Sequence, residues 1–207
     1  MRDIDILAFE RMIREEGINV IAGVDEAGRG PVAGPVTAAA VILPVDNLII
    51  GVADSKKMSE KVREKLAFKI RDTALDYSIA HVDNETIDHI NILNATRLAV
   101  RRAVERLKIK PEIILIDGKF LNVPGYNCVS VVKGDEYIYS ISAASILAKT
   151  TRDDLMRKYS ITYPKYRFDK NKGYLTAEHL SAISLYGLSP IHRRSFRYSI
   201  PINESNL

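Results

Sequence analysis

Four acidic residues stand where apolar runs give way to turns, and carboxylates in such positions can bind metal ions. Asp25 and Glu26 follow the run IAGV, Asp117 follows EIILI, and Asp135 follows VSVVKG. In open α/β sheets the strand ends form the usual ligand crevice, so carboxylates from several strands can converge there. Grouped carboxylates repel one another unless a cation joins them, and Mg²⁺ or Mn²⁺ takes such oxygen ligands. The pattern predicts a carboxylate metal site; the alternative is that each acid only caps a turn.

Two divalent ions at such a site would suit the hydrolysis of a phosphodiester. A pair of ions spanning a scissile phosphate generates hydroxide from water and stabilises both the attacking and the leaving oxygen. Other chemistry is poorly supported, because the four histidines form no HExxH pair and no serine has a nucleophile-elbow context. We expect His179 to be a surface or packing residue, His192 to belong to a basic loop, and Cys128 to lie in the core.

The segment DEAGRGPVAGP, residues 25–35, combines glycines, prolines and one arginine directly after the first two acids. It matches neither GxxxxGK[ST] nor GxGxxG, and its prolines lack the backbone donors that a phosphate cradle uses. We expect a rigid turn in which Gly28 and Gly30 let the backbone approach a ligand closely while Arg29 offers a charged fork to a phosphate. A purely structural Gly-Pro turn is the alternative.

Charge is distributed unevenly along this chain of 207 residues, which carries 30 Lys and Arg against 26 Asp and Glu. Residues 149–197 hold 11 basic and 4 acidic residues, a net charge of +7, with tyrosines and a phenylalanine interleaved. Such a stretch suits a nucleic acid, although a solvated basic face is the alternative. With one cysteine, no signal-peptide run and no apolar stretch of membrane-spanning length, we expect a cytoplasmic location.

The hydrophobic periodicity predicts an α/β fold in which a mixed sheet is flanked by helices. No repeat or linker divides the chain, so a single domain over residues 1–207 is expected. Strands are predicted over residues 19–24, 36–43, 77–82, 112–116 and 127–132. Helices are predicted from 60 to about 75 behind a Ser59 cap, from 83 or 84 to before Pro111, after Asp135, and from about 176 to 186.

Six blocks of this sequence resemble, in order, the motifs of bacterial ribonuclease HII. They are VDEAGRGPVAGPV, ADSKKMSEKVREKL, ILIDG, KGDEYIYSISAASILAKTTRDDLM, NKGYLTAEHL and YGLSPIHRRSF, and they span about residues 19–196. The resemblance implies a ribonuclease H-like fold with a helical C-terminal region. It also implies a metal-dependent endonuclease that cuts the RNA strand of RNA/DNA hybrids and nicks 5′ to a single ribonucleotide in duplex DNA, leaving a 3′-hydroxyl and a 5′-phosphate.

The resemblance also assigns roles to individual residues. It gives Asp25, Glu26, Asp117 and Asp135 as the catalytic acids that bind Mn²⁺ or Mg²⁺. It implies that the Gly28-Arg29-Gly30 turn and Tyr174 read the 2′-hydroxyl, which distinguishes RNA from DNA. Phosphate contacts are implied for Lys56, Lys57, Lys149 and Arg152, within a basic segment, about 149–197, that contributes to substrate binding.

The expected partner is therefore an RNA/DNA hybrid or a DNA duplex that contains ribonucleotides. We expect a monomer that binds no membrane and needs no obligate protein partner. Two alternatives remain open from the sequence. One is a nucleic-acid-binding protein without catalysis, although a binding module has no reason to gather four acids that repel phosphate. The other is a different two-metal nuclease of the same fold, which would share the acids but not the GRG and NKGY blocks.

Overall fold

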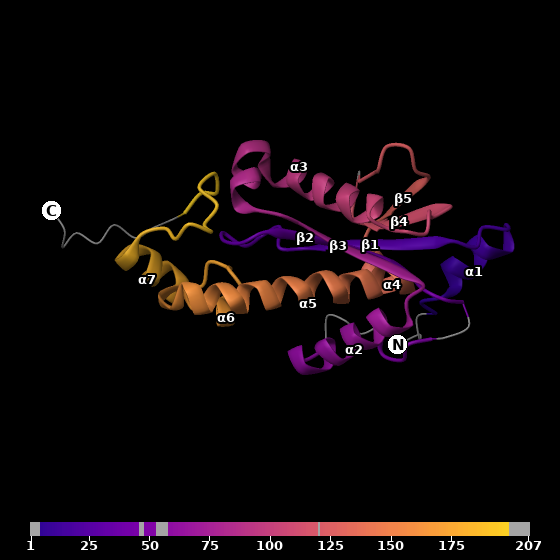
Figure 1. Cartoon of the computed structure of the whole chain (residues 1–207), viewed down its shortest axis with the longest axis horizontal. Coiled ribbons are helices and arrows are strands. Elements are labelled where there is room, and N and C mark those ends of the chain that lie inside the picture. Colours follow the sequence, from indigo (N-terminus) through magenta and orange to yellow (C-terminus); the bar gives the residue numbers. More distant parts are fainter. Residues whose placement is uncertain (1–4, 46–47, 53–57, 120, 199–207) are drawn as a thin grey trace.

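A mixed five-stranded sheet forms the centre of the molecule, with helices on both faces (Figure 1). This computed structural model describes residues 5–45, 48–52, 58–119 and 121–198. The strand order is β3-β2-β1-β4-β5; β1, β2 and β3 are antiparallel neighbours, while β4 and β5 run parallel to β1. The strands are β1 (Ile21–Ala27), β2 (Val36–Ile42), β3 (Asp76–Val82), β4 (Ile113–Asp117) and β5 (Cys128–Val131).

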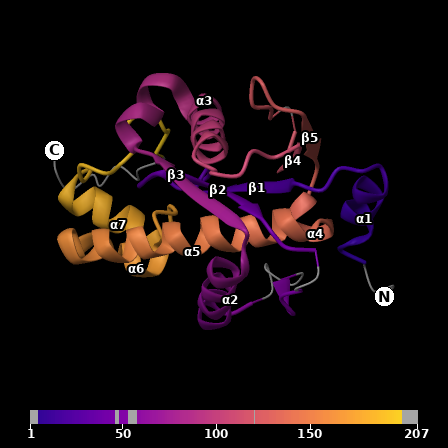
Figure 2. The ribbon, with the colours of Figure 1, turned by 45° about the vertical axis from the view of Figure 1, so that its right-hand side comes forward.

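Helix α3 covers one face of the sheet, and the long helix α5 covers the other with α2 on its outer side (Figures 1 and 2). The basic segment, about 149–197, begins in the second half of α5 and continues through the shorter helices at one end of the molecule. The helices are α1 (Ala8–Glu15), α2 (Glu60–Thr73), α3 (Asn84–Glu105), α4 (Gly134–Tyr137), α5 (Tyr139–Thr162), α6 (Phe168–Asn171) and α7 (Ala177–Tyr186), with a 3-10 turn, η2, at Pro164–Tyr166. Within the described ranges, no helix combines the length and apolar character needed to cross a membrane.

These elements confirm the predicted mixed sheet with flanking helices. Local signals placed several boundaries well: the Ser59 hydroxyl accepts a hydrogen bond from the Val62 N–H at 3.4 Å at the start of α2, and α7 ends at Gly187 with φ +73°. The short helices α1, α4 and α6 were not separately predicted. Each is eight residues or fewer, too short for a strong periodic signal.

The helix predicted from 83 or 84 to before Pro111 is kinked in the structure. Asn91 has φ +65°, and this kink divides α3 into two parts whose faces are not continuous. Val100 and Val104, after the kink, are buried, whereas Leu93 is 41% exposed. Cys128, expected in the core, is half-buried and packs against its margin.

Close packing of β1 on α5 fixes the position of the strand that carries the first acids. A Cβ built on Gly23 would lie 2.1 Å from the backbone carbon of Ser140 and 2.4 Å from the backbone nitrogen of Ile141. Ordinary contacts of a Cβ begin near 3.4 Å, so only glycine permits this approach. The helix therefore lies directly on the strand, and residues on both are held at a fixed separation.

Candidate active site at the strand ends

Three neighbouring segments bring the four predicted acids to one end of the sheet. Asp25 and Glu26 lie inside the last part of β1 rather than after it, and Asp117 is the final residue of β4. The parallel pairing of β1 with β4 reaches Val24 and Ile116, so Asp25 and Asp117 come next on adjacent strands. Asp135 lies in the first turn of α4, and a Cβ built on the preceding Gly134 would be 3.6 Å from Asp117 Oδ1.

The surroundings of Asp25 strongly perturb its carboxylate. It is buried, and burial raises its pKa well above the ordinary value; the negative charges of Glu26 and Asp117 raise the pKa further. A hydrogen bond with Ser145 on α5 and one donated at 2.6 Å by the Glu26 N–H act in the opposite direction. Negative charge is therefore concentrated here, at a point where a cation would be stabilised.

Glu26 carries a second sign of the same chemistry. Its Oε1 accepts a bond from Arg29 Nη1 at 3.1 Å, while its Oε2 is buried without a hydrogen-bond partner among the described residues. Burial raises the pKa of Glu26, an effect that Arg29 opposes and Asp117 reinforces. A buried carboxylate oxygen without a partner is unfavourable, so this atom fits the role of a metal ligand.

The side chains do not form a finished coordination sphere as they stand. Within residues 5–45, 48–52, 58–119 and 121–198, no three His, Cys, Asp or Glu side chains are grouped closely enough to hold a metal ion. The donors have the right chemistry, because all are carboxylates, and the repulsion that raises the Asp25 pKa also opposes their closer approach. A divalent cation would remove that repulsion.

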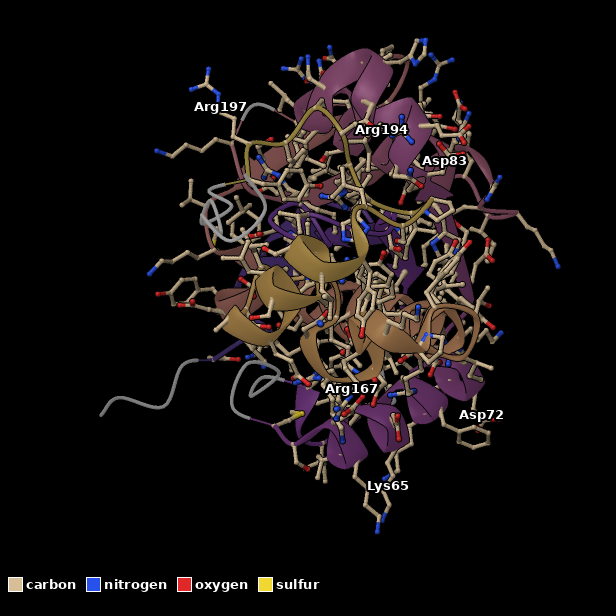
Figure 3. All side chains as sticks on the ribbon, turned by 90° about the vertical axis from the view of Figure 1, so that its left-hand side faces the viewer. Lys65, Asp72, Asp83, Arg167, Arg194 and Arg197 are labelled. Atoms are coloured by element: carbon tan, nitrogen blue, oxygen red, sulfur yellow. The ribbon has the colours of Figure 1, made fainter. Side chains whose placement is uncertain are left out.

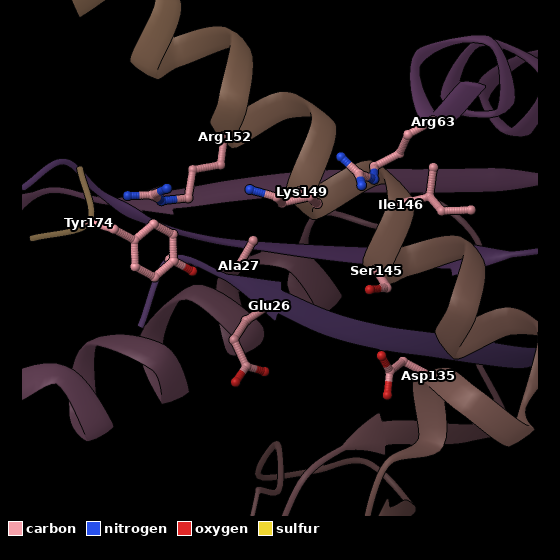
Figure 4. Close-up of a pocket in the computed structure, with 10 residues that line it drawn as sticks. Glu26, Ala27, Arg63, Asp135, Ser145, Ile146, Lys149, Arg152 and Tyr174 are labelled. Carbon is pink, nitrogen blue, oxygen red and sulfur yellow. The ribbon is translucent and has the colours of Figure 1, made fainter. Parts of the chain in front are cut away.

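A pocket of about 410 Å³ opens beside these acids. Figure 4 shows Glu26 and Asp135 on one wall and the cationic side chains of Arg63, Lys149 and Arg152 on the other. The cations come from α2 and α5. A polyanion that enters such a pocket can place its phosphates against the cationic wall and leave the acids for a metal ion.

The GRG turn and Tyr174 meet at the same pocket, although 144 residues separate Gly30 from Tyr174. A Cβ built on Gly30 would lie 3.6 Å from Tyr174 Cε1, and the Val32 N–H donates to the Gly173 carbonyl at 2.8 Å. Gly28 has φ +95°, and a Cβ there would be 2.1 Å from Arg152 Nε. Tyr174 is 48% exposed, so its ring remains available to a ligand.

The predicted phosphate contacts differ in their surroundings. Lys149 lines the pocket, and its Nζ donates to Asp153 Oδ1 at 2.7 Å. Arg152 also lines the pocket but is 1% exposed, and its guanidinium donates to the carbonyls of Pro35, Lys172 and Ala33 at 2.9–3.1 Å. It already holds the turn in place, and a phosphate contact from it stays a prediction. Lys56 and Lys57 lie outside the described residues.

Two buried residues near the turn were not predicted to contribute. His192, expected in a basic loop, is 1% exposed, and Arg193 beside it is fully buried. The exposed positive charge near α7 comes from other arginines. In Figure 3, Arg194 and Arg197 lie on the chain that follows α7, and Arg167 lies on the opposite side of that helix. His179, predicted as a surface or packing residue, is also fully buried. The sequence contains no local signal that separates Arg193 from Arg194.

Comparison with known proteins gives a consistent result. The family described as Ribonuclease HII matches residues 22–199. The ribonuclease HII of Ruminiclostridium cellulolyticum is 52% identical over 191 residues, 92% of this chain and 75% of that protein. That of Endomicrobium trichonymphae is 49% identical over 201 residues, 97% of this chain and 94% of that protein. The crystal structure of the ribonuclease H2 from Pyrococcus horikoshii OT3 has a TM-score of 0.73 at 30% identity, covering 86% of this chain and 93% of that one.

Proposed function

The chain belongs to the ribonuclease HII family and is a hydrolytic endonuclease, and on this premise we propose that it nicks duplex DNA 5′ to a single embedded ribonucleotide as well as cutting the RNA strand of RNA/DNA hybrids. The products are a 3′-hydroxyl and a 5′-phosphate. The observation that carries the proposal is the shared pocket, where Glu26 and Asp135 lie together with Gly28 of the GRG turn and Tyr174.

Asp25, Glu26, Asp117 and Asp135 are the residues that would hold the metal, Mg²⁺ or Mn²⁺. Bound divalent ions activate water and stabilise charge on the oxygens of a phosphodiester. The protein supplies a rigid set of hard oxygen donors, since close packing of α5 on β1 fixes the position of Asp25 and Ser145 holds its carboxylate. The buried Glu26 Oε2 supports the assignment, because a carboxylate that merely capped a turn would have hydrogen-bond donors around it.

Recognition of the ribonucleotide falls to the turn and to Tyr174. A 2′-hydroxyl both donates and accepts hydrogen bonds, so backbone groups of residues 28–30 can distinguish it from the hydrogen of a deoxyribose. The ring of Tyr174 next to Gly30 offers a flat surface for the following sugar. Arg29, whose side chain is about half exposed at the pocket margin, can reach a phosphate while it pairs with Glu26.

The rest of the chain supports binding of the duplex. Lys149 provides a cation at the pocket, and Lys56, Lys57 and Arg152 are proposed as further phosphate contacts. Residues 1–207 act as one catalytic domain in which the basic segment, about 149–197, extends the binding surface. The alternative of a non-catalytic binding protein is set aside, because the family is one of enzymes and the acids would repel a phosphate backbone.

The test is cleavage of a labelled DNA duplex that contains one ribonucleotide, with Mg²⁺, with Mn²⁺ and with chelator. We expect metal-dependent nicking only 5′ to the ribonucleotide, no nicking of an all-DNA duplex, and loss of nicking in Asp117→Asn. Asp72→Asn is the matched control, because Asp72 is an exposed acid on α2 away from the pocket. Tyr174→Ala should reduce nicking while leaving metal binding intact.

Two results would overturn the proposal. Nicking that continues in Asp117→Asn would remove the acids from the reaction, and equal nicking of the all-DNA duplex would remove the reading of the 2′-hydroxyl.

A further inference from the structure

The segment that follows α7 returns across the molecule to the GRG turn. His192 forms an isolated antiparallel bridge with Ala33, the Gly34 N–H donates to the Ile191 carbonyl at 2.9 Å, and the Arg193 N–H donates to the Val32 carbonyl at 2.8 Å. The carboxylate of Asp88 on α3 accepts bonds from the next two backbone N–H groups, which anchors the segment to the body of the protein. The turn therefore rests on a fixed support.

Arg193 holds the carbonyl side of that turn. Its fully buried guanidinium donates to Gly28 O at 2.6 Å, Arg29 O at 3.0 Å, Pro31 O at 2.6 Å and Gly34 O at 3.0 Å. Burial lowers the pKa of Arg193 to about 9, so the group is still cationic at neutral pH. A planar charged fork that satisfies four carbonyls fixes their directions more tightly than an ammonium group would.

The direction of the amide groups follows from this contact. In a trans peptide the C=O and the N–H point in opposite directions, so each carbonyl turned toward Arg193 turns the next N–H away from it. The Val32 N–H illustrates this, because the Pro31 carbonyl accepts from Arg193 while the Val32 N–H reaches the Gly173 carbonyl. By the same geometry the N–H groups of Arg29 and Gly30 face away from Arg193.

A chain of hydrogen bonds links His192 to Tyr174, the residue that lies beside the GRG turn. The Ser189 N–H donates to His192 Nδ1 at 2.8 Å, so the proton of His192 is on Nε2. That N–H points at His179 Nε2, 3.0 Å away, which leaves His179 Nδ1 protonated and donating to the Tyr174 carbonyl at 2.8 Å. The rings of Tyr166 and Phe168 pack against both histidines.

We propose that Arg193 and His192 are positioning residues for ribonucleotide recognition: Arg193 orients the backbone amides of the GRG turn, and His192, through His179, fixes the backbone of Tyr174. This inference rests on the proposed function, because it assigns the means by which the two halves of the reading site are held in register. Both side chains are buried, so each acts through the backbone that it holds.

The experiment compares two quantities for each variant in the full-length protein: kcat/KM for the duplex with one ribonucleotide, and Kd for the all-DNA duplex of the same sequence. For Arg193→Lys, which keeps the charge but not the fork, we expect kcat/KM to fall by about tenfold or more while Kd changes less than about twofold. His192→Asn should show the same split. Arg106→Lys and His81→Gln are matched controls. Arg106 also donates to a backbone carbonyl, that of Ile79 on β3, and His81 on β3 also forms a side-chain hydrogen bond, with Thr37.

The outcomes separate this inference from the proposed function. If the wild-type protein does not prefer the ribonucleotide, the proposed function fails. If the wild type shows the preference and both variants keep it, or if Lys at position 193 restores full kcat/KM, the inference alone is wrong. If both quantities change by the same factor in both variants, as a general loss of folded protein would cause, the inference is also overturned. Should Arg193→Lys fail to fold, His192→Asn, which acts only on the Tyr174 side, decides the matter.

Discussion

Lowering the pH should reduce the free energy of unfolding, because the protein buries the histidine pair His179 and His192. Burial and the neighbouring His179 lower the pKa of His192 from 6.5 to about 4, and burial also lowers the pKa of His179. The titratable side chains that face His192 are His179 on α7, Tyr166 in η2 and Tyr198. Between pH 6.5 and 4 His192 is protonated in the unfolded chain but not in the folded protein. The free energy of unfolding therefore falls as the pH falls.

The magnitude follows from the two pKa values. With 6.5 in the unfolded chain and about 4 in the folded protein, the His192 contribution lost between pH 8 and pH 5 is about 2 kcal/mol. The raised pKa values of Asp25 and Glu26 act in the opposite direction, because those groups favour the folded state as the pH falls. The total change is therefore not diagnostic, and a variant that removes only the histidine is needed.

The assay is urea unfolding of the wild type and His192→Gln at pH 5, 6, 7 and 8, with His89→Gln, which replaces an exposed histidine on α3, as the control. The wild type should lose about 2 kcal/mol more than His192→Gln over this range, and the control should follow the wild type. If the wild type and His192→Gln lose the same free energy to within about 0.5 kcal/mol, the reasoning about the buried pair is refuted.

Two further predictions concern the strand that carries the first acids. Gly23→Ala should lower the free energy of unfolding by about 1–3 kcal/mol in urea titrations, because its Cβ would meet the α5 backbone at 2.1 Å. Gly30→Ala is the comparison, because its Cβ would make an ordinary contact at 3.6 Å. Equal changes in the two variants would contradict the packing argument. Asp25→Asn should raise the melting temperature in chelator, because it removes a carboxylate that is buried and repelled by its neighbours; a lower melting temperature in chelator would argue against repulsion at this site. We also expect Mn²⁺ to raise the melting temperature of the wild type and not that of Asp25→Asn.

The elements, and the placement of Asp25 and Asp117 at adjacent strand ends, could be predicted because their signals are local. Strand-length apolar runs followed by Asp25-Glu26 and by Asp117 indicate adjacent strand ends, and the parallel register of β1 and β4 brings these residues together as expected. The boundaries were less accurate, since Asp25 and Glu26 lie within β1 and Asp135 begins a helix. A carboxylate can lie near the end of a strand when hydrogen bonds offset the cost of its burial, as the bonds from Ser145 and Arg29 do for Asp25 and Glu26.

The support of the site could not be predicted, because it depends on contacts between distant parts of the chain. Arg193 and Arg194 are adjacent and chemically identical, yet one is fully buried against carbonyls of residues 28–34 and the other is exposed. Only the path of the chain after α7 decides between them. The kink at Asn91 does have a local signal that was missed, because the Asn91 side chain accepts from the Asn94 N–H at 3.1 Å as a helix N-cap does.

The contact between Arg193 and the GRG turn also fixes the order in which the protein matures. Pro35 is synthesised 158 residues before Arg193, which at typical translation speeds is a delay of roughly 10 to 30 s. During that interval a growing chain already contains the glycine turn and, for part of it, all four acids, but not the arginine that orients the turn. The support of the turn is therefore completed only after all four acids have been synthesised, because Arg193 follows Asp135 by 58 residues.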